Sequence, residues 1–261
     1  MSRIIAVANQ KGGVGKTTTS VNLAASLAAA KRRVLLVDLD PQGNATMGSG
    51  IDKHDRAATV LDLLMAEAVF ADVVVRCDSG FDVVPANDDL TAAEVGLLEV
   101  DNREFRLRDI LAAVRQNYDF LVIDCPPSLN MLTVNALAAA DEVIIPMQCE
   151  YYALEGLTAL MNTIDKIKGA LNPALEIGGV LRTMFDPRNG LANDVSAQLE
   201  AHFGDKVFRT MIPRNVRLAE APSHGLPVIT YDDKSRGALA YLTLAGEILR
   251  RIDAMPPRAG K

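Results

Sequence analysis

Residues 4–19 of this chain read IIAVANQKGGVGKTTT. The stretch begins with five uninterrupted apolar residues, as is typical of a strand buried on both faces in a parallel sheet. Three glycines follow, Gly12, Gly13 and Gly15. They let the backbone turn sharply and approach a ligand without Cβ clashes. Lys16 and Thr17 then open a predicted helix, whose free N–H groups and positive dipole end face the loop. This order predicts a phosphate-binding loop.

The loop departs from the ordinary pattern G-x-x-x-x-G-K-[ST] at its start. Gly15, Lys16 and Thr17 fit the end of the pattern, but Gln10 occupies the position of the first glycine. A second lysine, Lys11, lies inside the loop instead. The sequence KGGVGKTT is therefore a deviant phosphate-binding loop.

Two other interpretations of the loop remain open. A glycine turn without a ligand would leave the two lysines and the threonine unexplained. A dinucleotide-binding fingerprint G-x-G-x-x-G would begin at Gly13, and Asp38 or Asp40 follows at about the 20-residue spacing that it asks for. However, Thr18 occupies its third glycine position, and such a fingerprint has no need of Lys16. The phosphate-binding loop is the favoured interpretation.

Composition limits the class of protein but does not reveal its function. The chain has 261 residues, of which 49% are hydrophobic, enough for one large α/β domain or two small ones. The net charge of −6 does not predict nucleic-acid binding, so any DNA contact needs a local basic patch. Cys77, Cys125 and Cys149 lack C-x-x-C spacing, which favours reduced thiols in a cytosolic protein. We expect no signal peptide before the first strand and no membrane span.

Apolar strands alternate with helical patterns along the whole chain. After the first strand, further strands are predicted at 34–38, 81–85, 120–124, 143–146 and 177–183. Helices are predicted at 17–30, 60–66, 88–98, 103–115, 129–139, 153–169, 191–203 and 236–253. The alternation predicts an α/β fold with a doubly wound, mainly parallel sheet and helices on both faces. Since no linker interrupts it, we expect a single domain over 1–261.

Three carboxylates follow predicted strands. Asp38 and Asp40 come after one strand, and Asp124 ends another in the manner of a Walker B element. Ligands of such sheets bind at the carboxyl ends of the strands. A carboxylate there can hold Mg²⁺, usually through water, while the Thr17 hydroxyl binds the ion directly. A strand-end aspartate can instead cap the next loop, but beside the phosphate-binding loop the metal role is favoured.

The chain resembles the ParA/Soj chromosome-partitioning ATPases, within the MinD-like superfamily of deviant Walker ATPases. The resemblance runs nearly end to end and rests on five blocks: KGGVGKTT (11–18), DLDPQGN (38–44), DCPPS (124–128), CEYYALEG (149–156) and IPRNVRLAEAPSHG (212–225). The first and third blocks are shared across the superfamily. The last two look specific to the chromosomal partition branch.

The resemblance implies a role for each matching residue. The phosphates of ATP would be bound by Lys11, Gly12, Gly13, Val14, Gly15, Lys16, Thr17 and Thr18, with Lys16 at the β- and γ-phosphates. Lys11 matches the signature lysine that reaches across a dimer interface to the partner's nucleotide. Asp40 matches the residue that positions or activates the attacking water. Thr17, Asp38 and Asp124 would surround Mg²⁺, and Pro213 and Asn215 belong to the segment that packs against adenine.

The resemblance also implies a function. We expect an ATPase of weak activity, stimulated by DNA and by a centromere-binding, ParB-type partner, that dimerises on ATP and drives chromosome partitioning. Arg188 and Arg217 match arginines that bind DNA without sequence preference, although each alone is also an ordinary surface residue. Phosphate contacts by scattered arginines would explain DNA binding by an acidic protein. The expected location is the cytoplasm, on the nucleoid.

Differences between this chain and related families bear on two alternative functions, operator binding and membrane association. The chain has no room before Arg3 for the DNA-reading domain of plasmid-type relatives, so operator binding is not expected. The alternative is a MinD-like, membrane-associated positioning ATPase, which ends in an amphipathic membrane helix. Here the final helix carries Leu239, Leu242, Leu249 and Ile252 at helical spacing, which we interpret as core packing. The helix is expected to stop at Pro256-Pro257.

Overall fold

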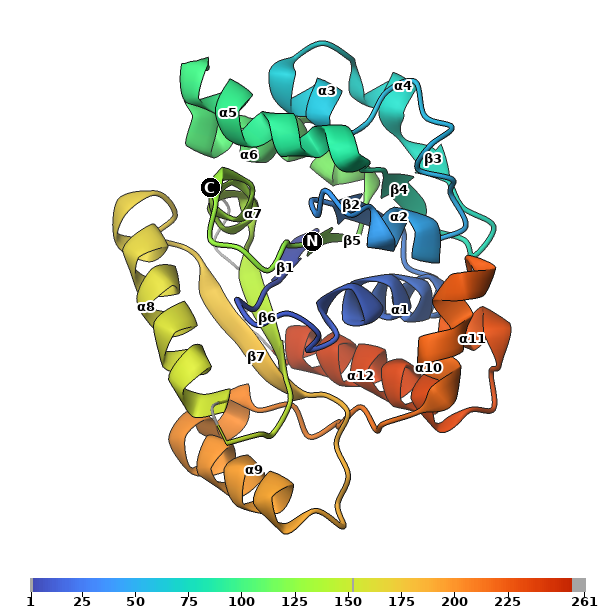
Figure 1. The fold of residues 1–261 in the computed structure, drawn as a ribbon, viewed down its shortest axis with the longest axis vertical. Helices are drawn as coiled ribbons and strands as arrows, with labels where there is room; N and C mark the ends of the chain where they lie inside the picture. Colours follow the sequence, from blue (N-terminus) through green and yellow to red (C-terminus); the bar gives the residue numbers. More distant parts are fainter. Residues whose placement is uncertain (1, 152, 255–261) are drawn as a thin grey trace.

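The computed structural model describes residues 2–151 and 153–254. Its strands form a seven-stranded sheet in the order β3-β4-β2-β5-β1-β6-β7 (Figure 1). The strands are β1 (Arg3–Val7), β2 (Val34–Asp38), β3 (Val75–Arg76), β4 (Asp82–Val84), β5 (Phe120–Asp124), β6 (Glu142–Met147) and β7 (Glu176–Arg182). Only β3 pairs antiparallel, with β4, and the other neighbouring pairs are parallel. The predicted doubly wound, mainly parallel sheet is confirmed.

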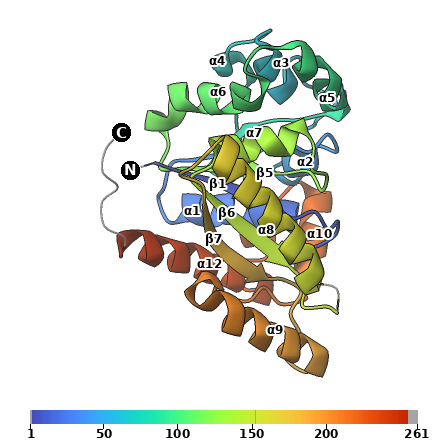
Figure 2. The same ribbon diagram turned by 90° about the vertical axis from the view of Figure 1, so that its left-hand side faces the viewer.

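Helices cover both faces of this sheet. On one face lie α1 (Lys16–Ala29), α2 (Asn44–Gly48), α10 (Val216–Glu220), α11 (Val228–Tyr231) and α12 (Arg236–Asp253). On the other lie α3 (Val60–Met65), α4 (Phe70–Val73), α5 (Ala93–Gly96), α6 (Arg106–Val114), α7 (Met131–Ala139), α8 (Ala153–Ala170) and α9 (Gly190–Phe203). Figure 2 shows α8 in front of β6 and β7. The fold is a three-layer α/β/α sandwich.

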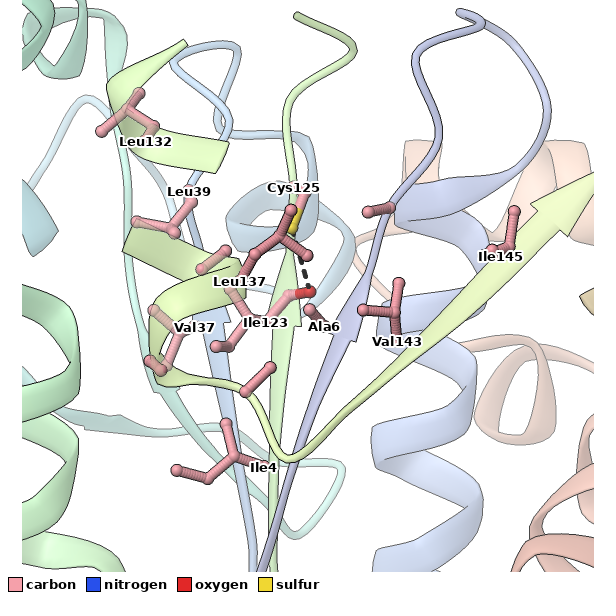
Figure 3. Packing of buried hydrophobic residues seen from close by; sticks show 14 of the residues in the cluster. Ile4, Ala6, Val37, Leu39, Ile123, Cys125, Leu132, Leu137, Val143 and Ile145 are labelled. Atoms are coloured by element: carbon pink, nitrogen blue, oxygen red, sulfur yellow. Dashed lines mark hydrogen bonds between the residues drawn. The ribbon is translucent and has the colours of Figure 1, made fainter. Parts of the chain in front are cut away.

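Alternate residues of each strand supply the two cores. In β1, Ile4 and Ala6 pack toward α7, whereas Ile5 and Val7 pack toward α1 and α12. Figure 3 shows the first of these layers, with Leu132 and Leu137 of α7 over the sheet. Strands that are buried on both faces read as continuous apolar runs, because neither face meets water. The buried central strands thereby fix the positions of the polar residues at their carboxyl ends.

Several predicted boundaries are wrong in an informative way. The helix predicted at 88–98 is broken into 3₁₀ turns around the single α-helical turn of α5, and 103–115 is α-helical only over Arg106–Val114. The short elements α2, α4, α10, α11 and β3 were not predicted. Each of these has five residues or fewer. Elements so short depend on tertiary packing rather than on a repeated apolar pattern.

The final helix packs differently from the prediction. Leu249 and Ile252 are partly buried against the core, as predicted. Leu239 and Leu242 are 53% and 39% exposed, so their predicted core packing is wrong. The stripe that faces the sheet consists instead of Ala238, Tyr241, Leu244, Ala245 and Ile248. Gly237 packs against Leu218 of α10, since an added Cβ would lie 2.6 Å from that side chain, and the two leucines lie outside the buried stripe.

Two expectations about the ends and about membranes can be compared with the structure only in part. The stop at Pro256-Pro257 and the basic tail lie outside the described residues. Within residues 2–151 and 153–254, none of the helices combines the length and apolarity that crossing a bilayer would require.

Candidate functional site: a nucleotide site at the carboxyl edge of the sheet

Parallel pairing brings the predicted site residues together. In the sheet register, Asp124 at the end of β5 lies opposite Asp38 at the end of β2 and opposite Val7 at the end of β1. The glycine loop leaves β1 at this same edge and returns as α1. The two carboxylates and the loop therefore meet where three central strands end, the usual ligand position in such sheets.

The glycine loop is braced from both sides. Gly13 and Gly15 have φ values of +73° and +86°, a left-handed conformation that side chains with Cβ atoms rarely adopt. The Asn9 side chain donates to the Pro146 carbonyl at 2.7 Å and accepts from the Lys11 amide at 3.0 Å. On the far side, the Thr183 hydroxyl donates to the Val14 carbonyl at 2.8 Å. These contacts hold the loop in one conformation.

Lys16 lies over this loop. The side chain is buried, and its Nζ donates to the Lys11 carbonyl at 3.1 Å. Burial lowers the pKa of Lys16, while Asp124, Cys125 and Asp40 oppose that shift. An ammonium has three donors, so two remain for phosphate oxygens. The contact of Lys16 with the phosphates stays a prediction.

The Lys11 side chain contacts the segment that follows β6. Its Nζ forms an ion pair of 2.6 Å with Oε2 of Glu150, and the two side chains are 47% and 52% exposed. Exposed ion pairs of this kind contribute little to stability. The Lys11 side chain can therefore exchange Glu150 for another anion at small cost. Sequence reasoning did not identify Glu150 as the partner, because the pairing joins residues 139 positions apart.

Asp124 is a fully buried carboxylate of the site. Its Oδ1 accepts a hydrogen bond of 2.7 Å from the Ser20 hydroxyl. Its Oδ2 is buried and has no hydrogen-bond partner among the residues that the structure describes. Burial, and then the nearby charge of Asp38, raise the pKa of Asp124 to about 8. A buried carboxylate oxygen without a donor is suited to a cation or to a cation's water.

The residues present fit Mg²⁺. The Thr17 hydroxyl lies near enough to the Asp124 carboxyl to lower its pKa, so hydroxyl and carboxylate oxygens, the ligands that Mg²⁺ prefers, lie close together. Over the described ranges, no cluster of three or more His, Cys, Asp or Glu side chains forms a ready-made metal cage. That agrees with Mg²⁺, which is usually bound through one or two carboxylates together with substrate phosphates.

Asp38 accepts hydrogen bonds from the loop and the helix that follow β2. Its Oδ1 accepts from the Asp40 amide at 3.1 Å, and its Oδ2 accepts from the amide and the hydroxyl of Thr46, both at 2.8 Å. Burial raises the pKa of Asp38 to about 6, and these hydrogen bonds oppose the shift. Because both oxygens already accept protein hydrogen bonds, the predicted contact with Mg²⁺ would run through water.

Asp40 is held at the mouth of the site. Its Oδ1 accepts from the Gln42 amide at 3.0 Å, and its charge acts on Lys16. The loop then turns at Gly43, whose φ is +62° and whose added Cβ would lie 2.8 Å from the Ala86 carbonyl oxygen. Only glycine fits there, so Asp40 is presented by a loop of defined shape.

A cavity of about 440 Å³ opens beside the first turns of α1. Its lining includes the predicted phosphate ligands Thr17 and Thr18, together with Val21, Asn22, Asn44, Met47, Gly48, Pro222, Ser223 and Leu226. A volume of several hundred Å³ suits a small molecule. Sequence reasoning missed these last eight residues, although Pro222 and Ser223 belong to a block that carried the resemblance. A larger hollow of about 1080 Å³ lies along β7 and is lined by none of the predicted site residues.

The predicted adenine segment does not line this cavity. Pro213 forms a bridge with Phe185 beyond the end of β7, and Asn215 caps α10 by accepting from the Arg217 amide at 3.0 Å. Their contact with adenine stays a prediction.

The two predicted DNA-binding arginines lie outside the nucleotide site. Arg188 is 89% exposed and pairs with Asp186 through two contacts of 3.0 and 2.8 Å, which helps to lower the pKa of Asp186 to about 2. Arg217 is 47% exposed and pairs with Glu220 at 2.8 Å and Asp232 at 3.2 Å. The structure therefore places both arginines at the surface, each beside an acid.

Comparison with known proteins places this site in a family. The model of an AAA domain family matches residues 2–177. Chromosome partitioning protein ParA of Caulobacter vibrioides is 55% identical over 252 residues, which cover 95% of this chain and 94% of that protein. Sporulation initiation inhibitor protein Soj of Bacillus subtilis is 55% identical over 249 residues, covering 95% and 98%.

A solved structure shares the fold. It is described as cobyrinic acid a,c-diamide synthase from Mycobacterium smegmatis with bound ADP and magnesium, and it matches with a TM-score of 0.86, 38% identity and full coverage of both chains. The curated relatives are closer in sequence, and they carry a different description. By its sheet, its deviant phosphate-binding loop and these relatives, the chain belongs to the ParA/Soj family of chromosome-partitioning ATPases.

Proposed function

We propose that this protein is a DNA-segregation switch driven by ATP. ATP closes a homodimer, the dimer binds DNA without sequence preference, and DNA together with a centromere-binding, ParB-type partner stimulates an otherwise weak hydrolysis. The observation that carries the proposal is the site itself, in which a second loop lysine, Lys11, points outward while Lys16 lies over the loop. We expect the protein to work in the cytoplasm, on the nucleoid.

The nucleotide step would use residues of the loop and of the neighbouring strand ends. The loop amides and Lys16 would bind the phosphates, and Thr17 with Asp124 would hold Mg²⁺. When bound, Mg²⁺ neutralises charge that develops on the phosphate oxygens. Asp40, close enough to act on the charge of Lys16, would orient the attacking water. In this assignment Asp38 keeps Asp40 and α2 in position.

The dimer step depends on Lys11. Within one subunit this side chain contacts Glu150, away from the loop's own phosphate position. A lysine that crosses to the partner's nucleotide would supply positive charge in trans, as arginine fingers do in other phosphoryl-transfer enzymes. ATP would then join the two subunits, since each phosphate chain would be bound by residues of both.

The DNA step depends on Arg188 and Arg217. Neither belongs to the phosphate-binding motifs, and both are exposed. A single subunit offers few phosphate contacts, and a dimer offers twice as many along one duplex. ATP would therefore raise DNA affinity through avidity. Contacts to phosphates alone release counterions and ignore base sequence, so the binding should weaken steeply with salt.

Cosedimentation with nonspecific DNA tests the proposal. The protein should pellet with DNA in ATP and stay in the supernatant in ADP or without nucleotide. Equal pelleting in all three conditions would contradict the nucleotide control. Stimulation of ATP hydrolysis by lipid vesicles but not by DNA would favour the MinD-like alternative.

A further inference from the structure

Ser20 is a buried residue of α1 that none of the recognised motifs includes. It is 0% exposed, and its Oγ lies 2.7 Å from Asp124 Oδ1 and 3.1 Å from the Lys16 carbonyl oxygen. A hydroxyl has one proton to donate. The shorter of the two contacts assigns that proton to Asp124, since 2.7 Å is an ordinary O–H···O distance and 3.1 Å is a long one.

The Ser20 hydrogen bond distinguishes the two oxygens of Asp124. Oδ1 is occupied by Ser20, whereas Oδ2 is buried and has no partner within the described part of the chain. A carboxylate with a single anchored oxygen keeps its second oxygen in one direction. Without that anchor, Asp124 could rotate about its terminal side-chain bond, whose torsion is broad.

Thr17 faces the same carboxylate from one turn earlier in α1. Residues three apart lie on one face of a helix, so α1 directs two hydroxyls at Asp124. The two hydroxyls differ in burial, since Ser20 is fully buried and Thr17 is partly open to the cavity beside α1. Only Thr17 is therefore placed to reach a ligand.

We propose that Ser20 is a positioning residue for the magnesium site. Ser20 holds Asp124 Oδ1 in every state of the protein, so that Oδ2 is directed to Mg²⁺ or its water. Thr17, which is partly open to the cavity, is the hydroxyl that would bind the ion itself. The inference rests on the nucleotide step of the proposed function, and it is independent of DNA binding and of the ParB-type partner.

Ser20→Ala tests the inference through metal dependence rather than through activity. Binding of a fluorescent ATP analogue is titrated with Mg²⁺, and the midpoint for metal is compared with that of the wild type. We expect Ser20→Ala to need about tenfold more Mg²⁺, as for the loss of one hydrogen bond to a charged group. Binding of the analogue without Mg²⁺ should be unchanged, because Ser20 contacts no phosphate position.

Ser26→Ala is the matched control. Ser26 lies on the same helix and is 1% exposed, and its Oγ has no hydrogen-bond partner among the residues described. Ser26→Ala removes a hydroxyl oxygen from an equally buried position without breaking a hydrogen bond, so its Mg²⁺ midpoint should equal that of the wild type. An equal rise in both variants would show a general effect on α1 and would overturn the proposal.

A second variant guards against misfolding. Ser20→Cys keeps the size of the side chain but donates only weakly, so it should raise the Mg²⁺ midpoint without leaving a cavity. If Ser20 has only a structural role, Ser20→Ala should lower the unfolding temperature, while the Mg²⁺ midpoints of Ser20→Ala and Ser20→Cys stay at the wild-type value. That result would overturn the proposal. If the wild type itself shows no Mg²⁺-dependent binding, the nucleotide step of the proposed function is wrong instead.

Discussion

Replacement of Asp124 by asparagine should stabilise the nucleotide-free protein while weakening its use of Mg²⁺. Burial raises the pKa of this carboxyl from 3.8 to about 8. At pH 7 it is then mostly protonated when folded and ionised when unfolded. Roughly three pH units separate pH 7 from the unfolded pKa, and at about 1.4 kcal/mol per unit the penalty on folding is roughly 4 kcal/mol.

Asparagine removes this penalty because it does not ionise. Its Oδ1 can still accept from Ser20, but its amide N–H groups need acceptors, and a buried unpaired donor costs about 1–3 kcal/mol. The net gain for Asp124→Asn is therefore about 1–3 kcal/mol at pH 7, which raises the unfolding temperature by several degrees in a protein of this size.

The dependence on pH gives the sharper test. A carboxyl whose folded pKa is raised stabilises the fold below its unfolded pKa, and this contribution is lost as pH rises through the folded pKa. Asp38 and Asp124 lie opposite each other and titrate as a pair with pKa values of about 6 and about 8, so the slope between pH 6 and 8 reports mainly the second of these protons. Over those two units the wild type should lose about 2 kcal/mol that Asp124→Asn keeps.

Urea unfolding of the metal-free and nucleotide-free protein at pH 6, 7 and 8 measures this difference. Mg²⁺ with an ATP analogue should reduce the change of the wild type's unfolding free energy with pH, since the bound cation favours the ionised carboxylate. The change with pH should stay the same in Asp124→Asn. Equal slopes for the two proteins between pH 6 and 8 would refute the assignment of a buried, protonated Asp124.

Three further predictions concern the remaining steps. Asp40→Ala should bind ATP and accumulate as a dimer without hydrolysis, and a wild-type rate of phosphate release would remove Asp40 from the water-positioning role. Lys11→Ala should stay monomeric by light scattering in ATP while circular dichroism shows an unchanged fold, whereas a normal ATP-dependent dimer would exclude Lys11 from the interface. Asp186→Asn should raise DNA affinity roughly two- to fivefold, because it frees Arg188 from an exposed ion pair. Unchanged affinity in a DNA titration would show that Asp186 does not compete with phosphate.

Much of the site follows from local sequence. The glycine loop, Lys16 and the strand-end Asp124 were predicted because each depends on a short pattern: glycines for left-handed backbone, and an apolar run for a buried strand. Parallel strands then bring separate carboxyl ends to one edge, so the meeting of Asp38 with Asp124 also follows.

The remaining features depend on contacts between distant segments. The pairing of Lys11 with Glu150 and the cavity beside α1 join parts of the chain that no local pattern links. The exposed Leu239 and Leu242 show the same limit, because helical spacing predicts an apolar face without fixing which neighbouring stripe meets the sheet. Ser20 was missed because a buried serine has no distinctive spacing, and its role is visible only from its hydrogen bond.

The central claim is that ATP gives this protein affinity for DNA of any sequence through two surface arginines. Its most direct test titrates a labelled nonspecific duplex with the wild type, Arg188→Glu and Arg217→Glu, in ATP at two salt concentrations. Arg33→Glu is the matched control, since Arg33 is an exposed arginine that is also ion-paired, with Asp119, but lies just before β2 at the opposite edge of the sheet. We expect tight, salt-sensitive binding by the wild type and the control, and loss of binding in both Arg188→Glu and Arg217→Glu with ATP-dependent dimers intact. Wild-type affinity in both variants, or a strong preference for one DNA sequence, would contradict it.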